Sequence, residues 1–129
     1  MNNIDDPLGI LIVSHGSPRE DANRRFVAMV ERIASRLGRS HVCAAFLTVA
    51  EFSIPRRVAE LAEQGVRRIV LMPYFLFAGQ HVTRGIPELL EHCRQAHPQV
   101  TFEVLPTLED DPALEDLLVH RLQLHGVST

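Results

Sequence analysis

Two histidines stand where an α/β protein commonly places its reactive side chains. His15 follows the apolar run 8–14, and His81 follows the apolar run 67–72 after a longer loop. In an open α/β sheet, ligands bind outside the carboxyl ends of the strands, at the point where the strand order reverses. Imidazole binds first-row divalent metals and accepts protons near neutral pH. If the two runs are neighbouring strands, both imidazoles face one cleft, which suits the replacement of protons by a metal.

The loop before His81 is unusually rich in apolar and aromatic side chains. Phenylalanine and leucine most often pack in the core, here between a strand and the next helix. Ligand pockets are also mostly hydrophobic with a few placed polar groups, so the same segment suits the wall of a pocket for a flat conjugated macrocycle. Both interpretations stay open, and the wall would consist of Tyr74, Phe75, Leu76, Phe77, Ala78 and Gly79.

The segment 14–17, Ser-His-Gly-Ser, allows two other interpretations. His15 can be incidental in a glycine turn, or Ser14 or Ser17 can be the nucleophile of a hydrolase. The hydrolase is the weaker hypothesis, because the strand–turn–helix serine elbow has the pattern Gly-x-Ser-x-Gly, which this segment lacks. All 13 basic residues are arginine. Without lysine, the chain can form neither a Schiff base nor a lysine-containing phosphate loop.

The elements that position these residues follow from apolar patterning. Four apolar runs, at 9–14, 41–47, 67–72 and 101–105, alternate with helical patterns at about 18–37, 54–64, 86–97 and 112–124. Near-continuous apolar strands separated by helices predict a parallel sheet covered on both faces. The fold class is therefore α/β, a small four-stranded parallel sheet with helices on both faces, in one flavodoxin-like or chelatase-like domain over 1–129.

Helix boundaries are predicted from capping residues. Ser17 with Glu20 reads as a capping box that starts the first helix and fixes the loop of His15. Ser53 and Asp111 each precede a proline at a predicted helix start, and Gly38 stands at a predicted helix end. The remaining histidines and the arginine pairs, including Arg56-Arg57, are most simply solvent-exposed or structural; these histidines are His41, His92, His97, His120 and His125.

Composition limits the partners. A formal net charge of −3 argues against nucleic acid or an anionic membrane surface, and no apolar run approaches the roughly 18 residues of a membrane span. Cys43 and Cys93 lie in unrelated segments without CxxC spacing, so we expect reduced thiols. The N-terminal segment is acidic and unlike a signal peptide. A cytoplasmic protein is therefore expected.

Three segments together resemble the short, single-domain form of the CbiX/SirB-type class II chelatases. They are ILIVSHGS at 10–17, AFLTVAEFSIP at 45–55 and PYFLFAGQHVTRGIP at 73–87. The resemblance implies a homodimer that inserts Co²⁺, Fe²⁺ or Ni²⁺, as substrate, into sirohydrochlorin or a related tetrapyrrole without nucleotide hydrolysis. It assigns metal binding and proton acceptance to His15 and His81, and Glu51 matches an acidic position of the second motif.

The chain differs from the usual family pattern at three positions. Family members usually carry glutamate, proline and aspartate where this chain has Thr48, Phe52 and Gly85. The absence of a carboxylate at position 48 keeps a second hypothesis open. In it the protein is not catalytic, and is either a carrier of tetrapyrrole or metal or an inactive partner subunit of a chelatase. Turnover distinguishes the two, because a carrier binds without releasing metallated product.

Overall fold

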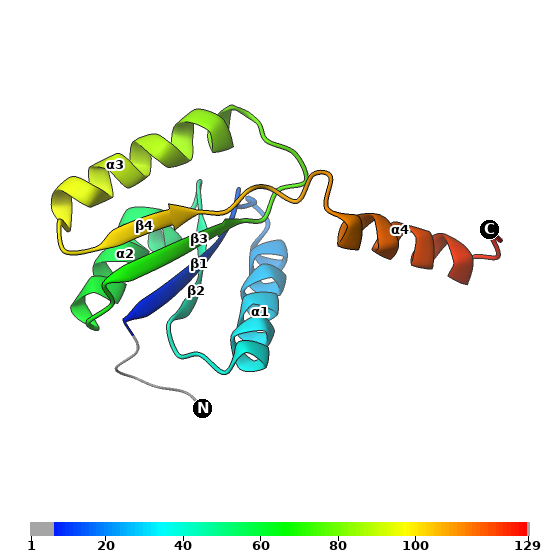
Figure 1. Cartoon of the computed structure of the whole chain (residues 1–129), viewed down its shortest axis with the longest axis horizontal. Coiled ribbons are helices and arrows are strands. Elements are labelled where there is room, and N and C mark those ends of the chain that lie inside the picture. The colour runs from blue at the N-terminus through cyan, green and yellow to red at the C-terminus, as the bar shows by residue number, and fades with distance from the viewer. Residues whose placement is uncertain (1–6, 129) are drawn as a thin grey trace.

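The predicted parallel sheet is present in the computed structural model, which describes residues 7–128 apart from the side chains of His81 and Val82 (Figure 1). The strand order is β2-β1-β3-β4, and all three pairings are parallel. This confirms the fold class. The strands are β1 (Leu8–Ser14), β2 (Val42–Phe46), β3 (Arg68–Pro73) and β4 (Thr101–Val104).

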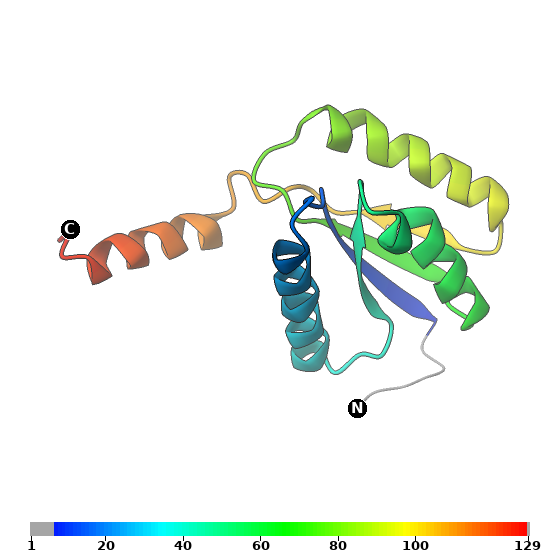
Figure 2. The ribbon, with the colours of Figure 1, turned by 180° about the vertical axis from the view of Figure 1, so that it is seen from behind.

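Three helices pack on the sheet and a fourth does not (Figures 1 and 2). Helix α1 (Glu20–Leu37) lies on one face and packs with the side chains of β1 and β2 that point there. Helices α2 (Ile54–Glu63) and α3 (Ile86–Ala96) lie on the other face over the larger cluster of buried apolar residues. Helix α4 (Pro112–Leu124) points away from the sheet and contains no buried residue.

The strand order reverses between β1 and β3. From β1 the chain moves to β2 on one side, and then crosses back to β3 on the other side. The carboxyl ends of β1 and β3 are adjacent, since Val13 pairs with Pro73. The sequence places His15 directly after β1 and His81 after β3, so the predicted neighbourhood of the two strands is confirmed.

The start of α1 differs from the sequence prediction. The helix begins at Glu20, and Arg19 occupies the N-cap without a side-chain cap, so Ser17 is not the capping residue. The Ser17 hydroxyl instead accepts a hydrogen bond from the Arg19 amide (3.1 Å). The Asn23 side chain holds the Ser17 backbone, accepting from its N–H (3.0 Å) and donating to its carbonyl (2.9 Å). A side chain one turn inside the helix thus fixes the loop that the capping box was predicted to fix.

Other predicted boundaries agree with the structure. Ser53 and Asp111 cap α2 and α4, accepting hydrogen bonds from the backbone amides of Arg56 (3.3 Å) and Ala113 (2.8 Å). Gly38 ends α1 in the left-handed region with φ 67°. Two short helical turns were not predicted, the 3₁₀ turn η1 (Ala50–Phe52) and the π-helical turn η2 (His81–Gly85). Among residues 7–128, no helix has the length and apolarity needed to cross a membrane.

Candidate functional site

His15 lies on an exposed turn at the carboxyl end of β1. Its carbonyl accepts two hydrogen bonds from Thr48, one from the backbone N–H (3.1 Å) and one from the hydroxyl (2.9 Å). Gly16 has φ 94°, and a Cβ there would lie 2.5 Å from the Thr48 hydroxyl oxygen. The turn therefore needs glycine for both its conformation and its close approach. The segment after β2 holds the backbone of His15 and leaves its side chain exposed.

The backbone of His81 begins η2, at the same edge of the sheet. The preceding loop closes with two hydrogen bonds to the Gly79 carbonyl, from the Thr83 amide (2.8 Å) and the Thr83 hydroxyl (3.0 Å). The imidazole of His81 itself lies outside the described part of the structure. The two histidine-bearing segments therefore lie at one edge of the sheet. That both imidazoles face one cleft stays a prediction.

The aromatic loop 74–79 divides between packing and exposure. The ring centroids of Tyr74 and Phe26 of α1 lie 5.4 Å apart with the ring planes tilted by 40°, and Phe75 packs against the main core. Leu76 and Phe77 are 56% and 73% exposed, and Ala78 and Gly79 are exposed as well. Phe75 therefore serves the core, as the common use of such residues suggests, whereas Tyr74 contacts Phe26 and is still 47% exposed. Tyr74 and the four residues after Phe75 can face a ligand.

Glu109, which follows β4, fastens this loop and was missed by the sequence analysis. One carboxylate oxygen accepts hydrogen bonds from the Ala78 amide (3.3 Å) and from the Thr107 hydroxyl (2.8 Å). The Leu108 amide also donates to the Phe75 carbonyl (3.0 Å). The sequence signal that could have identified Glu109 was a carboxylate in the loop after the fourth strand, because the loops that follow parallel strands meet at one edge of the sheet.

Glu51, the third predicted metal ligand, lies in η1 and is exposed. It lines an open cavity of about 570 Å³ between α1 and η1, and His15 is not among the lining residues. Within the described residues, no three histidine, cysteine or carboxylate side chains are close enough to hold a metal together. The structure therefore brings Thr48, rather than Glu51, against the turn of His15.

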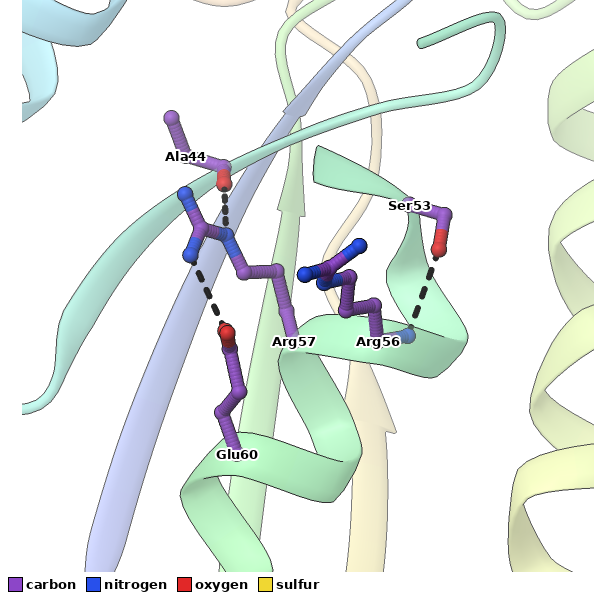
Figure 3. A network of polar contacts seen from close by, with 5 residues as sticks. All are labelled: Ala44, Ser53, Arg56, Arg57 and Glu60. Atoms are coloured by element: carbon purple, nitrogen blue, oxygen red, sulfur yellow. Dashed lines mark hydrogen bonds and ion pairs between the residues drawn. The ribbon is translucent and has the colours of Figure 1, made fainter. Parts of the chain in front are cut away.

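Arg57 fixes the start of α2 against the edge strand β2 (Figure 3). Its Nε donates to the Ala44 carbonyl (2.9 Å), and a terminal nitrogen pairs with Glu60 (3.0 Å). Its guanidinium lies 4.5 Å from the centroid of the Phe52 ring. The expectation of a solvent-facing arginine is wrong for Arg57, whose side chain is only 20% exposed. The contacts link η1 and the start of α2 to β2.

The two thiols are unsuited to a reactive role. Both cysteines are free, and Cys93 is a buried residue of α3. Burial raises the pKa of both thiols above the ordinary value of 9.0, although Arg57 acts to lower that of Cys43. Since the thiolate is the nucleophilic form, this favours inert thiols. His41 is buried, and His92, His120 and His125 are exposed.

Fold and site together define a class of protein: a one-sheet α/β domain with a histidine-bearing loop after each of the two strands that flank the reversal of strand order. Ligands of such sheets bind at this edge. The chain belongs to the CbiX family, whose family model matches residues 9–124. This confirms the resemblance drawn from the sequence.

Relatives of the chain include named chelatases. It is 31% identical over 122 residues to the chloroplastic sirohydrochlorin ferrochelatase of Arabidopsis thaliana, covering 95% of this chain and 54% of that protein. It is 35% identical over 81 residues to the sirohydrochlorin cobaltochelatase of Methanocaldococcus jannaschii, covering 63% and 57%. The matched residues thus span little more than half the length of each of these curated relatives.

A solved structure of similar length also matches. A protein from Marinobacter aquaeolei, named as a CbiX protein of cobalamin biosynthesis, superposes with a TM-score of 0.76 at 25% identity. The match covers 91% of this chain and 98% of that one. The fold therefore occurs in a chain of about this length.

Proposed function

We propose that this protein inserts a divalent metal ion, Co²⁺, Fe²⁺ or Ni²⁺, into sirohydrochlorin or a related tetrapyrrole without nucleotide hydrolysis. The observation that carries the proposal is the placement of the two family histidines after β1 and β3, the adjacent strands at which the strand order reverses. The sirohydrochlorin chelatases named among the relatives support the choice of substrate.

In the proposed step, His15 and His81 bind the incoming metal through neutral imidazole nitrogens. Neutral imidazole is the form that ligates a metal. As the metal bonds to the pyrrole nitrogens of the macrocycle, two N–H bonds break and two protons leave. Imidazole nitrogens released by the metal, or water, accept those protons. The exposed side chains of Leu76 and Phe77 provide the apolar wall against which the macrocycle lies.

We further propose a homodimer located in the cytoplasm. The chloroplastic relative from Arabidopsis thaliana is much longer than this chain, because the 122 matched residues are only 54% of it, so two copies of this chain supply a comparable amount of protein. Closed two-fold symmetry is the commonest form of assembly. The cytoplasmic location is supported by the free thiols Cys43 and Cys93, since oxidising compartments favour disulfides.

The second candidate function is a carrier, or an inactive partner subunit. The observation in its favour is that Thr48 offers the turn of His15 a neutral hydroxyl, already engaged with the His15 carbonyl, where a carboxylate would add charge for a metal. The carrier binds metal or tetrapyrrole without turnover.

The test is an absorbance assay of the purified protein with sirohydrochlorin and each metal in turn. We expect metallated product to accumulate over many turnovers. His15→Ala and His81→Ala should each lower the rate by on the order of 100-fold, because each removes a ligand and proton acceptor. His92→Ala, at an exposed histidine of α3, is the matched control and should leave the rate unchanged.

Circular dichroism accompanies the assay to show that the variants remain folded. Equal rates in the wild type and both site variants would refute the mechanism. Stoichiometric binding without turnover, by a folded protein, would establish the carrier instead.

A further inference from the structure

The segment 48–52, which follows β2 and precedes α2, supports the turn of His15. From this segment the Thr48 amide and hydroxyl both donate to the His15 carbonyl (3.1 and 2.9 Å). A Cβ on Gly16 would lie 3.2 Å from the Cβ of Phe46 at the end of β2, so the turn also packs closely on that side chain. A shift of the segment 48–52 therefore displaces the backbone of His15.

The backbone of this segment does little to hold the segment in place. Its 3₁₀ turn, η1, is closed by the Phe52 amide, which donates to the Val49 carbonyl (3.1 Å). Hydrogen bonds in 3₁₀ turns have poorer geometry than those in α-helices. Ala50 and Glu51 are exposed, and Phe52 is half-buried. The family resemblance leads us to expect proline at position 52, which would restrict the backbone there, so in this chain side-chain contacts have to fix the segment instead.

The Phe52 side chain makes two such contacts. Its ring meets the buried Phe46 ring edge-on, with the centroids 5.6 Å apart and the ring planes at 77°. The guanidinium carbon of Arg57 lies 4.5 Å from the Phe52 centroid, within the roughly 6 Å range of a cation–π contact. Phe46 belongs to β2 and Arg57 to α2, so Phe52 ties η1 to the elements that precede and follow it in the chain.

Arg57 is itself fixed by two further contacts (Figure 3). Its Nε donates to the Ala44 carbonyl of the edge strand β2 (2.9 Å), and a terminal nitrogen pairs with Glu60 in the next turn of α2 (3.0 Å). A guanidinium is planar and carries several N–H donors in a fixed geometry, so it can make these two contacts and still lie against the Phe52 ring. A lysine ammonium at this position could not make all three contacts together.

Two other arginines provide a comparison for Arg57. Arg56, the preceding residue, uses its backbone amide in this network (Figure 3). Arg94 makes contacts of the same kinds on α3, because it pairs with Glu91 (3.4 Å) and lies 5.7 Å from the centroid of the Phe102 ring. It belongs to the last turn of α3, which leads to the amino end of β4, at the edge of the sheet opposite the candidate site. Arg57 and Arg94 therefore make similar contacts at opposite edges, and Arg57 is the one that reaches η1.

We propose that Arg57 is a positioning residue of the candidate site: through the Phe52 ring it holds the segment 48–52, and with it the turn of His15, in the arrangement that binds the divalent metal. The inference deepens the proposed function and rests on it. It gives Arg57 no part in binding the macrocycle, because the proposed wall lies in the loop after β3, which Glu109 holds. Metal binding and macrocycle binding therefore respond differently to the loss of Arg57.

Hydrogen exchange of the full chain tests the positioning without any metal. Arg57→Met keeps a long apolar side chain and loses the guanidinium. The Thr48 and Phe52 amides should then exchange about tenfold faster, as expected when a hydrogen bond from a charged donor that holds their segment is lost. The Thr83 amide, which closes the loop before η2, should exchange at an unchanged rate.

Titration with Co²⁺ and steady-state kinetics measure the consequence for the site. In Arg57→Met the affinity for Co²⁺ should fall about fivefold, somewhat less than removal of a direct hydrogen-bond partner of a metal ligand costs. The KM for the metal should rise by the same factor, while the KM for the tetrapyrrole stays within about twofold. The sign distinguishes positioning from charge, because removal of a positive charge would by itself favour a divalent cation.

Three variants show whether the effect passes through the Phe52 ring. Arg57→Lys keeps the charge but not the three contacts, so it should behave like Arg57→Met. Phe52→Leu removes the ring and should cause the same loss of affinity. Because both changes break one contact, Phe52→Leu/Arg57→Met should lose little more than either change alone. Phe52→Leu also tests the contact if Arg57→Met does not fold.

The matched controls are Arg56→Met, which removes the same charge from the neighbouring residue, and Arg94→Met, which breaks the comparable contacts on α3. Both should leave the affinity for Co²⁺ within about twofold. Circular dichroism shows whether each variant is folded. Unchanged exchange of the Thr48 and Phe52 amides in folded Arg57→Met would overturn the inference, and so would equal rises in the two KM values.

The same measurements separate this inference from the proposed function. A wild type that binds and inserts no metal, with exchange accelerated as expected in Arg57→Met, refutes the proposed activity and leaves Arg57 as the residue that holds the turn. A wild type that inserts metal, with exchange and metal affinity unchanged in Arg57→Met, refutes the inference and leaves the activity standing.

Discussion

Thr48 holds the turn of His15 through a hydrogen bond and contributes a neutral side chain to the proposed site. Its hydroxyl donates to the His15 carbonyl at 2.9 Å and lies where a Cβ on residue 16 would clash. Glutamate in this position has no hydroxyl to donate. Compared with the glutamate that the family resemblance leads us to expect, Thr48 therefore offers a hydrogen bond to the backbone of His15 in place of a carboxylate.

Thr48→Val removes that hydrogen bond while keeping the side-chain shape. We expect a loss of about 1 kcal/mol of unfolding free energy, typical of one intramolecular hydrogen bond. Metal affinity should fall several-fold, because His15 is held less firmly. Thr48→Ser, which keeps the hydroxyl, is the control and should stay near wild type in urea denaturation and metal titration. Equal stability of the Thr48→Val variant and the wild type would show that the hydroxyl does not hold the turn.

Thr48→Glu tests the chemical side of the same position. A carboxylate adds negative charge beside a divalent metal and a further proton acceptor, so insertion at limiting metal should rise. The readout pairs metal affinity with the rate of product formation, for Thr48→Glu and Glu51→Ala. If Glu51→Ala abolishes turnover while Thr48→Glu changes nothing, the acidic role belongs to Glu51, despite its position facing the α1–η1 cavity.

At the scale of elements, the loop of His15 depends on Asn23 rather than on a helix cap. Asn23→Ala removes two hydrogen bonds to the Ser17 backbone and should cost about 1–2 kcal/mol, whereas Ser17→Ala removes one exposed bond and should cost less than about 1 kcal/mol. Asn23→Asp keeps the acceptor and loses the donor, so it should fall between them. Urea denaturation measures the unfolding free energies of the three variants and so gives their order. The reverse order would restore Ser17 as the residue that fixes this loop.

The loop 74–79 depends on another element in the same way. Glu109→Ala removes the acceptor shared by Ala78 and Thr107, and we expect the KM for the tetrapyrrole to rise several-fold while kcat changes little, because Glu109 positions the wall and touches no reacting atom. Glu109→Gln keeps an acceptor oxygen and should rescue most of the loss. Asp116→Ala, at an exposed carboxylate of α4, is the control. A fall in kcat with KM unchanged would contradict a positioning role.

At the scale of the whole molecule, alkaline stability reports on the buried thiols. Burial raises the pKa of Cys43 and Cys93 in the folded state above the ordinary 9.0. Unfolded chains therefore release these protons first as pH rises, and the folded state loses relative stability above about pH 9. The chain has no lysine, so few other groups titrate there. The unfolding free energy of Cys43→Ala/Cys93→Ala should decline less between about pH 8 and 10 than that of the wild type; an equal decline would contradict this.

The sequence by itself determined the family, the parallel sheet, and the edge of the sheet at which the two histidine-bearing loops lie. Apolar runs such as 9–14 and 67–72 correctly predicted strands, because strands buried on both faces need unbroken apolar sequence. The shared edge could be predicted because the residues that follow parallel strands meet at one edge of the sheet. Ser53 and Asp111 were recognised as caps because capping depends on neighbours along the chain.

The tertiary structure alone decided which contacts hold these segments. Thr48 meets His15, Glu109 meets Ala78, and Arg57 meets Ala44 across sequence separations of 33, 31 and 13 residues, which no local pattern encodes. It also divided the loop 74–79 between core and surface, and placed α4 away from the sheet although its sequence reads as an apolar helix. Local patterns specify which element forms and which side of it is apolar, whereas the surface that covers it depends on where the rest of the chain, or a second copy, lies.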